Sequence, residues 1–376
     1  MRRKAFPNTY QGANDTIKKL ISLTLTLALA LCALAVPAMA EEAPVWKEGI
    51  LSMLNMSEEE AANFVTAQLL LAAQMRKEGY TTKDGSRPEN ADDANYEWTL
   101  PKIEMVPYDS LDAMLMALNA GDIMAMLVYQ STAHYLMRSI PGLYVPVDYS
   151  YGANSGNAFA RTALSEFLTN DFAFMFMQDK AGLRDEFNTA ISAMREDGTL
   201  DKLAEIYIDG VNAGNEPEAI AMPAIEGAET VKVAVTGCLP PMDYVAPDGT
   251  PAGYNTAVLA EISTRMNKNI KLVQVDSLGR AAALVSGAVD AVFWTRTNHA
   301  SNEWAEMSAE ERATDHQSLA EEMSEEEAAT HEQFHQLIDF ESYGKMDMPE
   351  GTIISDSYYS DVLVPIWFHE RVKREG

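Results

Sequence analysis

The stretch IKLVQVDSLGRAAALVSGAVDAVFWTRT, Ile270–Thr297, decides the fold. Its pattern predicts a strand, a turn, a short helix rich in Ala and Leu, and a second strand. A second copy of the pattern lies upstream in KIEMVPYDSLDAMLMALNAGDIMAMLVYQ, Lys102–Gln130, and the two copies align on Gly121 and Gly287. Two strand–helix–strand units predict two related α/β lobes, and a cleft between lobes is a common place for a small ligand.

The first 40 residues have the pattern of a secretory signal peptide. Basic residues precede an apolar run, Ile21–Val36, that is short for a membrane span, and small residues allow cleavage near Ala40. We therefore expect an extracytoplasmic protein, located in the periplasm, at the cell surface or outside the cell. An uncleaved amphipathic anchor and a lipoprotein attached through Cys32 are the two alternatives.

The composition excludes some classes of function. Hydrophobic residues make up 47% of the 376 residues, which is enough for ordinary packed cores, so the chain is not disordered as a whole. The net charge of −28 repels nucleic acid and anionic lipid and is compatible with a cationic or zwitterionic ligand. Beyond the predicted leader, Cys238 is the only cysteine in the sequence, so no internal disulfide is expected.

Composition and periodicity divide the rest of the chain into segments. A helical pattern with Ser57 as its N-cap opens the region after the leader. A region with Pro217 and Pro223 and small or acidic neighbours is the predicted interdomain linker. The expected order is a helical segment and loop at 41–96, an α/β domain at 97–210, the linker at 211–229, and an α/β domain at 230–376 with an acidic helical insertion at 302–337.

Several segments resemble the extracellular solute-binding proteins of ABC importers, in particular the amino-acid type of family 3. The opening strand and turn of lobe one resemble VKVAVTGCLPPMDYVAPDGTPAGYN, and its helix and second strand resemble SLGRAAALVSGAVDAVF. SDSYYSDVLVPIWF resembles the exit of lobe one toward the hinge. LDAMLMALNAGDIMAMLVYQSTAHYL and LRDEFNTAISAMREDGTLDKLAEIYI resemble the middle and the end of lobe two.

The resemblance implies a two-lobed architecture of the periplasmic-binding-protein type II kind, with a mixed sheet flanked by helices in each lobe. It also implies a monomeric receptor that captures a small polar solute, such as an amino acid, for the permease of an ABC importer. No enzymatic activity, cofactor or nucleic-acid partner is implied. Lobe-two-like segments precede lobe-one-like segments, so the chain is either a circular permutation with one cleft or a piece of a tandem protein with two incomplete halves.

The resemblance and the residue types give a set of candidate ligand-binding residues. Met242 stands where the family has an aromatic residue, and Tyr244 could supply that ring instead. Thr297 matches a family threonine, whereas the expected arginine falls near Asn302, so Arg296 would have to serve. Tyr129 stands where the family has an aspartate that receives an amine. The full set is Met242, Tyr244, Trp294, Thr295, Arg296, Thr297, Tyr358, Tyr129 and Ser131.

One motif indicates a different class of function. His331-Glu332-Gln333-Phe334-His335 is a literal H-E-x-x-H, which on a helix would place both histidines on one face for a metal, with the glutamate as general base. The neighbouring run is rich in Glu, so the motif is also expected by composition alone. A metal-dependent hydrolase using His331 and His335 is therefore one alternative. A degenerate interaction module without a transport role is the other.

Overall fold

A computed structural model gives the fold. The structure describes residues 45–52, 57–59, 61–66, 102–145, 169–217, 219–246, 249–276, 278–297, 323–325, 328–329, 332–333 and 349–368. Val45–Gly376 forms one compact unit. All the described residues therefore belong to one compact unit.

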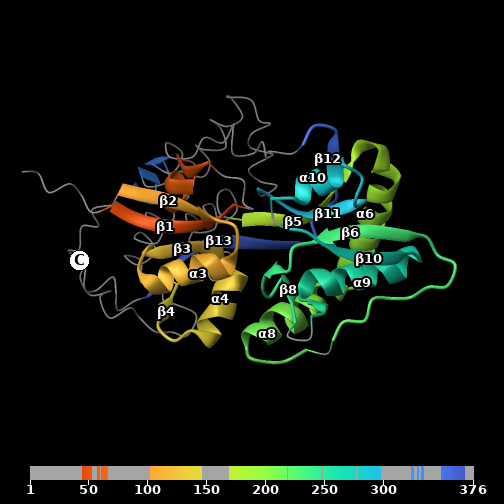
Figure 1. The fold of residues 1–376 in the computed structure, drawn as a ribbon, viewed down its shortest axis with the longest axis horizontal. Coiled ribbons are helices and arrows are strands. Elements are labelled where there is room, and N and C mark those ends of the chain that lie inside the picture. Colours follow the sequence, from red (N-terminus) through yellow and green to blue (C-terminus); the bar gives the residue numbers. More distant parts are fainter. Residues whose placement is uncertain are drawn as a thin grey trace, which may run out of the picture. The chain divides into compact units, whose positions relative to one another are not determined.

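Among the described residues, ten strands pair into one sheet and three short strands pair into another. The main path of the large sheet is β10-β6-β11-β5-β13-β3-β1-β2, while β12 pairs with β5 and β4 pairs with β13 (Figure 1). The strands of this sheet are β1 (Val45–Leu51), β2 (Lys102–Tyr108), β3 (Ala125–Tyr129), β4 (Leu143–Tyr144), β5 (Thr169–Met177), β6 (Thr230–Val235), β10 (Asn269–Gln274), β11 (Ala291–Thr297), β12 (Thr352–Ile354) and β13 (Tyr359–Phe368). The small sheet contains β7 (Cys238–Leu239), β8 (Asp243–Val245) and β9 (Pro251–Ala252).

The large sheet consists of two halves with the same strand order. Half A contains β1 to β4 and most of β13. In this half the three strands β2, β1 and β3 are parallel, and β13 is antiparallel to β3. Half B contains β5 to β12. In this half the three strands β10, β6 and β11 are parallel, and β5 is antiparallel to β11. β5 and β13 also pair antiparallel with each other, and this pairing joins the halves. The mixed α/β fold predicted from the sequence is confirmed.

The two sequence copies occupy matching places in the two halves. The first copy forms β2, α3 (Leu111–Ala120) and β3, and the second forms β10, α10 (Arg280–Val285) and β11. Gly121 and Gly287 follow the two helices with φ angles of 84° and 72°, a left-handed conformation that glycine adopts at little cost at the end of a helix. The repeat read from the sequence is therefore a structural repeat.

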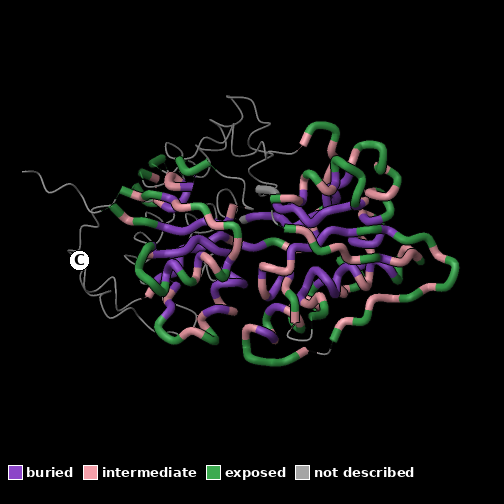
Figure 2. Tube along the Cα trace, in the orientation of Figure 1, coloured by how far each residue is buried: buried purple, intermediate pink, exposed green. Residues whose placement is uncertain are grey.

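Phenylalanines on one face of β5 form the centre of the core in half B. Besides α10, the described helices of this half are η4 (Gln178–Lys180), α6 (Ala181–Glu196), α7 (Thr199–Ala204), the π-helix η5 (Glu205–Asp209), α8 (Gly210–Asn212) and α9 (Tyr254–Met266). Phe174 and Phe176 alternate along β5, and both meet the ring of Phe187 on α6 edge-on, with centroids 5.3 and 5.0 Å away. Each buried Phe side chain contributes about 1.5–3 kcal/mol. Buried residues line the strands of both halves (Figure 2).

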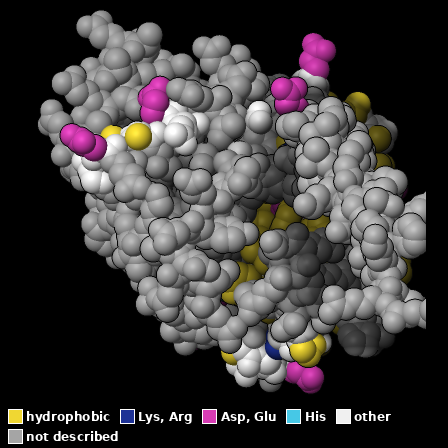
Figure 3. Space-filling view, turned by 90° about the vertical axis from the view of Figure 1, so that its left-hand side faces the viewer, with side chains coloured by type: hydrophobic (Ala, Val, Ile, Leu, Met, Phe, Trp, Pro, Cys, Tyr) yellow, Lys and Arg dark blue, Asp and Glu magenta, His cyan; other side chains and the backbone are white. Residues whose placement is uncertain are grey.

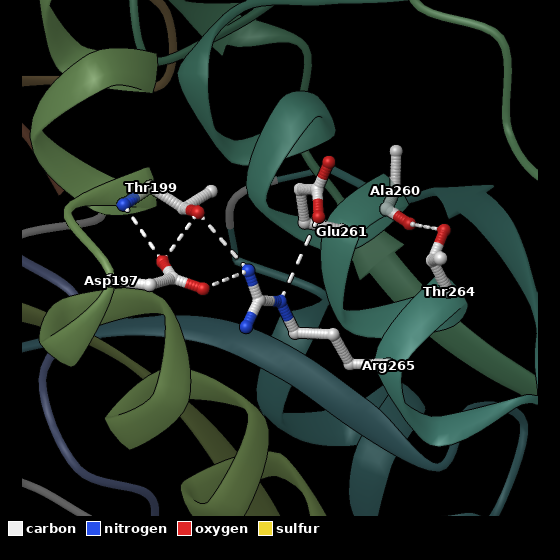
Figure 4. Close-up of polar contacts among 6 residues, drawn as sticks. All are labelled: Asp197, Thr199, Ala260, Glu261, Thr264 and Arg265. Atoms are coloured by element: carbon white, nitrogen blue, oxygen red, sulfur yellow. Dashed lines mark hydrogen bonds and ion pairs between the residues drawn. The ribbon is translucent and has the colours of Figure 1, made fainter.

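Arg265 on α9 fixes the turn between α6 and α7. Its Nη2 donates to Asp197 Oδ2 at 2.8 Å and to Thr199 Oγ1 at 3.0 Å, and its Nε lies 3.7 Å from Glu261 Oε2 (Figure 4). The hydrogen bonds from Thr199 and Arg265 hold the pKa of Asp197 below its usual value. These side chains are partly exposed, so the network adds little stability and mainly orients α6 and α7 against α9.

The segment after the leader differs from its prediction. The sequence pattern predicts a helical segment and loop over 41–96, whereas Val45–Leu51 forms β1 between β2 and β3. Backbone hydrogen bonds to two neighbouring strands and burial of Ile50 and Leu51 outweigh a weak helical pattern. The predicted helix start is present, because the N–H of Ala61 donates to the carbonyl of Ser57 at 2.9 Å. Residues 67–96 lie outside the described residues.

The strand pairings also correct two predicted boundaries. Residues 169–210, expected in the first α/β domain, belong to half B, because β5 pairs with β11 and Arg265 holds the α6–α7 turn. The predicted linker 211–229 connects α8 with β6 inside half B, where two hydrogen bonds with Asn269 hold Ile225 at 2.8 and 2.9 Å. The chain thus crosses between halves through the apolar strand β5, which composition alone does not mark as a boundary. Most of the predicted insertion 302–337 lies outside the described residues.

Two further facts concern the surface and the character of the helices. Figure 3 shows acidic side chains at separate points of one face and hydrophobic side chains near its centre. In the part of the chain that the structure describes, no helix combines the length and the apolar character that crossing a membrane requires.

Gly253 gives a test of the packing around the small sheet. Its φ of 99° is a conformation reserved for glycine, and a Cβ there would lie 2.6 Å from the carbonyl oxygens of Pro241 and Met242. We expect Gly253→Ala to lower the free energy of unfolding by about 2–4 kcal/mol, measured by urea denaturation. The control is Gly182→Ala in α6, where a Cβ meets nothing within 4 Å, and which we expect to be neutral or slightly stabilising. Equal stability of both variants would contradict the close approach at Gly253.

Candidate functional site

The carboxyl ends of β3 and β11 meet where β5 pairs with β13. Thr297, the last residue of β11, is paired with Asn170, and Asn170 is paired with Asp361. Two residues further along β13, Leu363 is paired with Tyr129, the last residue of β3. Ligands of open α/β sheets bind outside the carboxyl ends of strands where the strand order changes. The strand register therefore places a candidate site at this junction.

Tyr129 and Thr295 bring the two copies of the repeat into contact. They occupy matching positions in the two copies, each eight residues after the aligned glycines Gly121 and Gly287. Burial raises the pKa of Tyr129, and the neighbouring Thr295 side chain lowers it, while the Tyr129 hydroxyl itself makes no hydrogen bond among the described residues. The Tyr129 ring also packs on Phe172 of β5, with centroids 4.9 Å apart. Two buried polar side chains from opposite halves therefore lie next to each other.

Asp361 on β13 holds the first turn of α4 (Gln130–Ser139). Its Oδ2 accepts a hydrogen bond from the N–H of Ser131 at 3.2 Å, and its Oδ1 accepts from the N–H of Val362 at 2.8 Å. A carboxylate at a helix N-terminus is stabilised by the free N–H groups there. Burial nevertheless raises the pKa of Asp361 to about 6, although hydrogen bonds from Ser131, Val362 and Gln130 oppose the rise.

We define the junction site as Tyr129, Ser131, Asn170, Thr295 and Asp361. All five side chains are at least nine-tenths buried. The Asn170 amide nitrogen has no hydrogen-bond partner among the described residues. Buried polar groups in proteins are nearly always hydrogen-bonded, so this donor is suited to bond a polar solute or water.

Trp294 points away from the junction site. Because neighbours along a strand face opposite sides, Thr295 faces Tyr129 while Trp294 lies in a hydrophobic cluster with Met175 and Leu284. The guanidinium of Arg280 on α10 lies 4.8 Å from the centroid of the Trp294 ring and donates to the carbonyl of Phe293 at 3.0 Å. Burial lowers the pKa of Arg280, whereas Tyr129, Cys238 and Asp243 raise it. Arg280 and Trp294 thus support β11 from behind.

Tyr244 lies at a second contact between the halves. Its ring is 6.3 Å from the ring of Tyr135 on α4, and the Arg138 guanidinium lies 5.4 Å from the Tyr135 centroid. Burial raises the pKa of the half-buried Tyr244, with a contribution from Tyr135. Tyr244 therefore lies beside the junction rather than in it.

Met242 and Tyr358 lie in the hydrophobic core. Met242 is fully buried, and its carbonyl accepts from the N–H of Asn255 at 2.8 Å. The hydroxyl of Tyr358 donates to Asn255 Oδ1 at 2.8 Å, and its ring stacks on Phe174 at 4.8 Å. These contacts are those of core residues. Arg296 and Thr297 lie on β11, opposite Asp171 and Asn170, and their side chains lie outside the described residues.

Three residues that matter here were not predicted from the sequence. Asn170 and Asp361 lie near the starts of β5 and β13, which we call the crossing strands because they pair with each other across the two halves. Arg280 lies on α10. The only sequence signal for Asp361 is an acidic residue directly before the apolar run VLVPIWF. For Arg280 there is an equally weak signal, a single basic residue at the start of the Ala-rich helix.

The family comparison matches the central part of half B. Residues 231–311 match a family model described as bacterial extracellular solute-binding proteins, family 3. The resemblance seen in the sequence is confirmed for this segment. The match covers less than half of the chain and includes β6 to β11. A comparison with curated proteins found no match.

Solved structures give only distant similarity. The ligand-binding component of an ABC-type import system from Staphylococcus aureus, with zinc bound, has 10% identity and a TM-score of 0.33 over 88% of this chain and 68% of that chain. Full-length CbnR in complex with its target DNA has 9% identity and a TM-score of 0.32, over 98% of this chain and 77% of that chain. The periplasmic aliphatic sulphonate binding protein SsuA from Escherichia coli has 10% identity and a TM-score of 0.31, over 88% and 64%. TM-scores this low support no conclusion about this chain.

The metal-dependent alternative gains no support. His331 and His335 lie outside the described residues, so the predicted pair is not placed. Within the described ranges, no three His, Cys, Asp or Glu residues are arranged to hold a metal ion.

The pKa of Asp361 predicts a pH-dependent stability. Because folding raises this pKa from 3.8 to about 6, the folded state binds the proton more tightly than the unfolded chain does. Asp361 then contributes stability that is fully present below pH 3.8 and is lost as the pH rises through 6. We therefore expect the free energy of unfolding of Asp361→Asn to increase by about 1–3 kcal/mol relative to that of the wild type as the pH rises from 4 to 7. Urea unfolding at each pH measures this difference.

The control is Asp179→Asn, which alters an exposed carboxylate in the turn after β5. Its unfolding free energy should run parallel to that of the wild type over the same pH range. Parallel curves for Asp361→Asn as well would show that Asp361 does not titrate as described.

Proposed function

We propose that the protein is an extracytoplasmic receptor that captures a small polar solute, an amino acid or a similar molecule, for an ABC-type importer. The observation that carries the proposal is the meeting of the carboxyl ends of β3 and β11 at the β5–β13 crossing. The family match of residues 231–311 to extracellular solute-binding proteins supports it independently.

Each half supplies part of the junction site. Tyr129 and Ser131 come from half A, Thr295 comes from half B, and Asn170 and Asp361 come from the crossing strands. A solute that bonds groups of both halves favours the arrangement in which the halves are close together. Bending at the β5–β13 crossing is the motion that would bring the halves together.

The chemistry of the junction site suits a polar solute. The Asn170 amide offers a donor, and the hydroxyls of Tyr129, Ser131 and Thr295 can donate or accept. Arg296, at the end of β11, is the proposed partner of a solute carboxylate. Rings of Tyr129 and Phe172 give the site an apolar wall, as is usual in pockets for small molecules.

The remaining parts of the proposal concern place and partners. The leader directs the chain out of the cytoplasm, with cleavage near Ala40. There the protein acts as a monomer, without enzymatic activity or nucleic-acid partner, and delivers its solute to a membrane permease.

A thermal-shift screen of the protein from Glu41 onward tests the proposal. A solute that binds only the folded state raises the melting temperature by mass action. We expect at least one amino acid or similar polar solute to do so, and we expect Tyr129→Phe and Thr295→Val to weaken its binding about 5- to 50-fold, measured by calorimetry.

Tyr358→Phe is the matched control, because it removes a buried hydroxyl that bonds Asn255 in the core. It should lower stability and leave the solute affinity unchanged. A solute whose affinity falls equally in all three variants would place its site elsewhere. No shift with any amino acid, polyamine or small sugar would contradict the receptor function.

A further inference from the structure

Helix α4 of half A contacts half B at a place that the crossing strands do not reach. Arg138, near the end of α4, donates a hydrogen bond from Nη1 to the carbonyl of Val211 in α8. Asn212, the next residue, donates from Nδ2 to the carbonyl of Ser131 at 3.2 Å. Both ends of α4 are therefore bonded to α8, which follows α7 and η5 in half B (Figure 1).

Ser131 is held on both sides of its backbone. Its N–H donates to Asp361 on the crossing strand, and its carbonyl accepts from Asn212 in half B. The Tyr135 ring, one turn later, faces Tyr244 of β8, and the Arg138 guanidinium covers that ring. Bending at the β5–β13 crossing that separates the halves must break the bonds to α8, whereas the bond to Asp361 stays within the crossing.

We propose that Arg138 and Asn212 form a latch between the halves, which holds α4 against half B and so positions Ser131 at the junction site. Neither residue belongs to the junction site, so both are positioning residues. Their effect on solute affinity rests on the proposed function, but the latch itself does not.

Breaking the latch shifts the balance between closed and open arrangements. Two hydrogen bonds, one of them from a charged guanidinium, stabilise only the closed arrangement. Their removal should raise the ratio of open to closed molecules at least about tenfold.

A distance measurement between spin labels tests the latch. The labels are placed at Met116→Cys on α3, which is 67% exposed, and at Lys271→Cys on β10, in a Cys238→Ser background of the protein from Glu41 onward. One label then reports on each half. We expect a single distance population in this background and a second population in the Arg138→Ala/Asn212→Ala variant.

The matched control removes the same two side-chain types inside half B. Arg184 Nη1 donates to the carbonyl of Ile354 at 3.3 Å, and Asn188 Oδ1 accepts from the N–H of Asp356 at 2.8 Å. Arg184→Ala/Asn188→Ala should leave the distances unchanged. Arg138→Lys keeps a hydrogen-bond donor for the carbonyl of Val211. This single variant should therefore keep most of the closed population that Arg138→Ala/Asn212→Ala loses.

Two results would overturn the latch. One is an unchanged distance distribution in Arg138→Ala/Asn212→Ala. The other is a second population of the same size in the control variant, which would indicate general loosening. Where the thermal-shift screen yields a solute, the latch variant should also bind it several-fold more weakly, because fewer molecules are in the competent state. A screen without a solute would contradict the receptor function and leave the distance result to decide the latch.

Discussion

Four residue pairs, from Phe172 with Tyr359 to Thr169 with Val362, join β5 to β13 and through them the two halves. Every other strand of the large sheet pairs within its own half. The chain enters half B by one of these strands and leaves it by the other. Because the two strands are antiparallel, they bring the carboxyl ends of β3 and β11 together from opposite directions. The position of the junction site follows from this geometry before any side chain is considered.

The pairing also explains why polar groups are buried at this point. Asn170 and Asp361 face each other across the two strands and occupy equivalent positions in the two halves. The Asp361 carboxylate bonds the first turn of α4, while Asn170 is its uncharged counterpart. Desolvation makes the charged member costly, which is the cause of its raised pKa. Groups whose pKa values are shifted by burial occur often at functional sites.

The sequence predicted those parts of the fold that repeat or alternate locally. The two strand–helix–strand copies were visible because their periodicity is strong and glycines follow their helices. The strand β1 was missed because its partners lie more than fifty residues away, and pairing partners leave no local signal. For the same reason Tyr129 and Thr295 could be named as candidates, yet their contact could not be foreseen. Trp294 was placed in the site because residue type does not reveal which face of a strand a side chain takes.

The order of the strands has a consequence for the synthesis of the chain. β3 emerges early with five buried residues, but its outer edge pairs with β13, and Leu363 follows its partner Tyr129 by 234 positions. At roughly 5–20 residues per second, the ribosome needs about 10–50 s to cover that interval. Throughout it, half A carries an apolar strand with an unpaired edge, which is a template for wrong pairing. Half B is exposed to the same hazard for nearly as long, because one edge of β5 pairs with β13 and Val362 follows its partner Thr169 by 193 positions. Chaperones that protect the nascent protein therefore have two apolar edges to cover, one on β3 and one on β5.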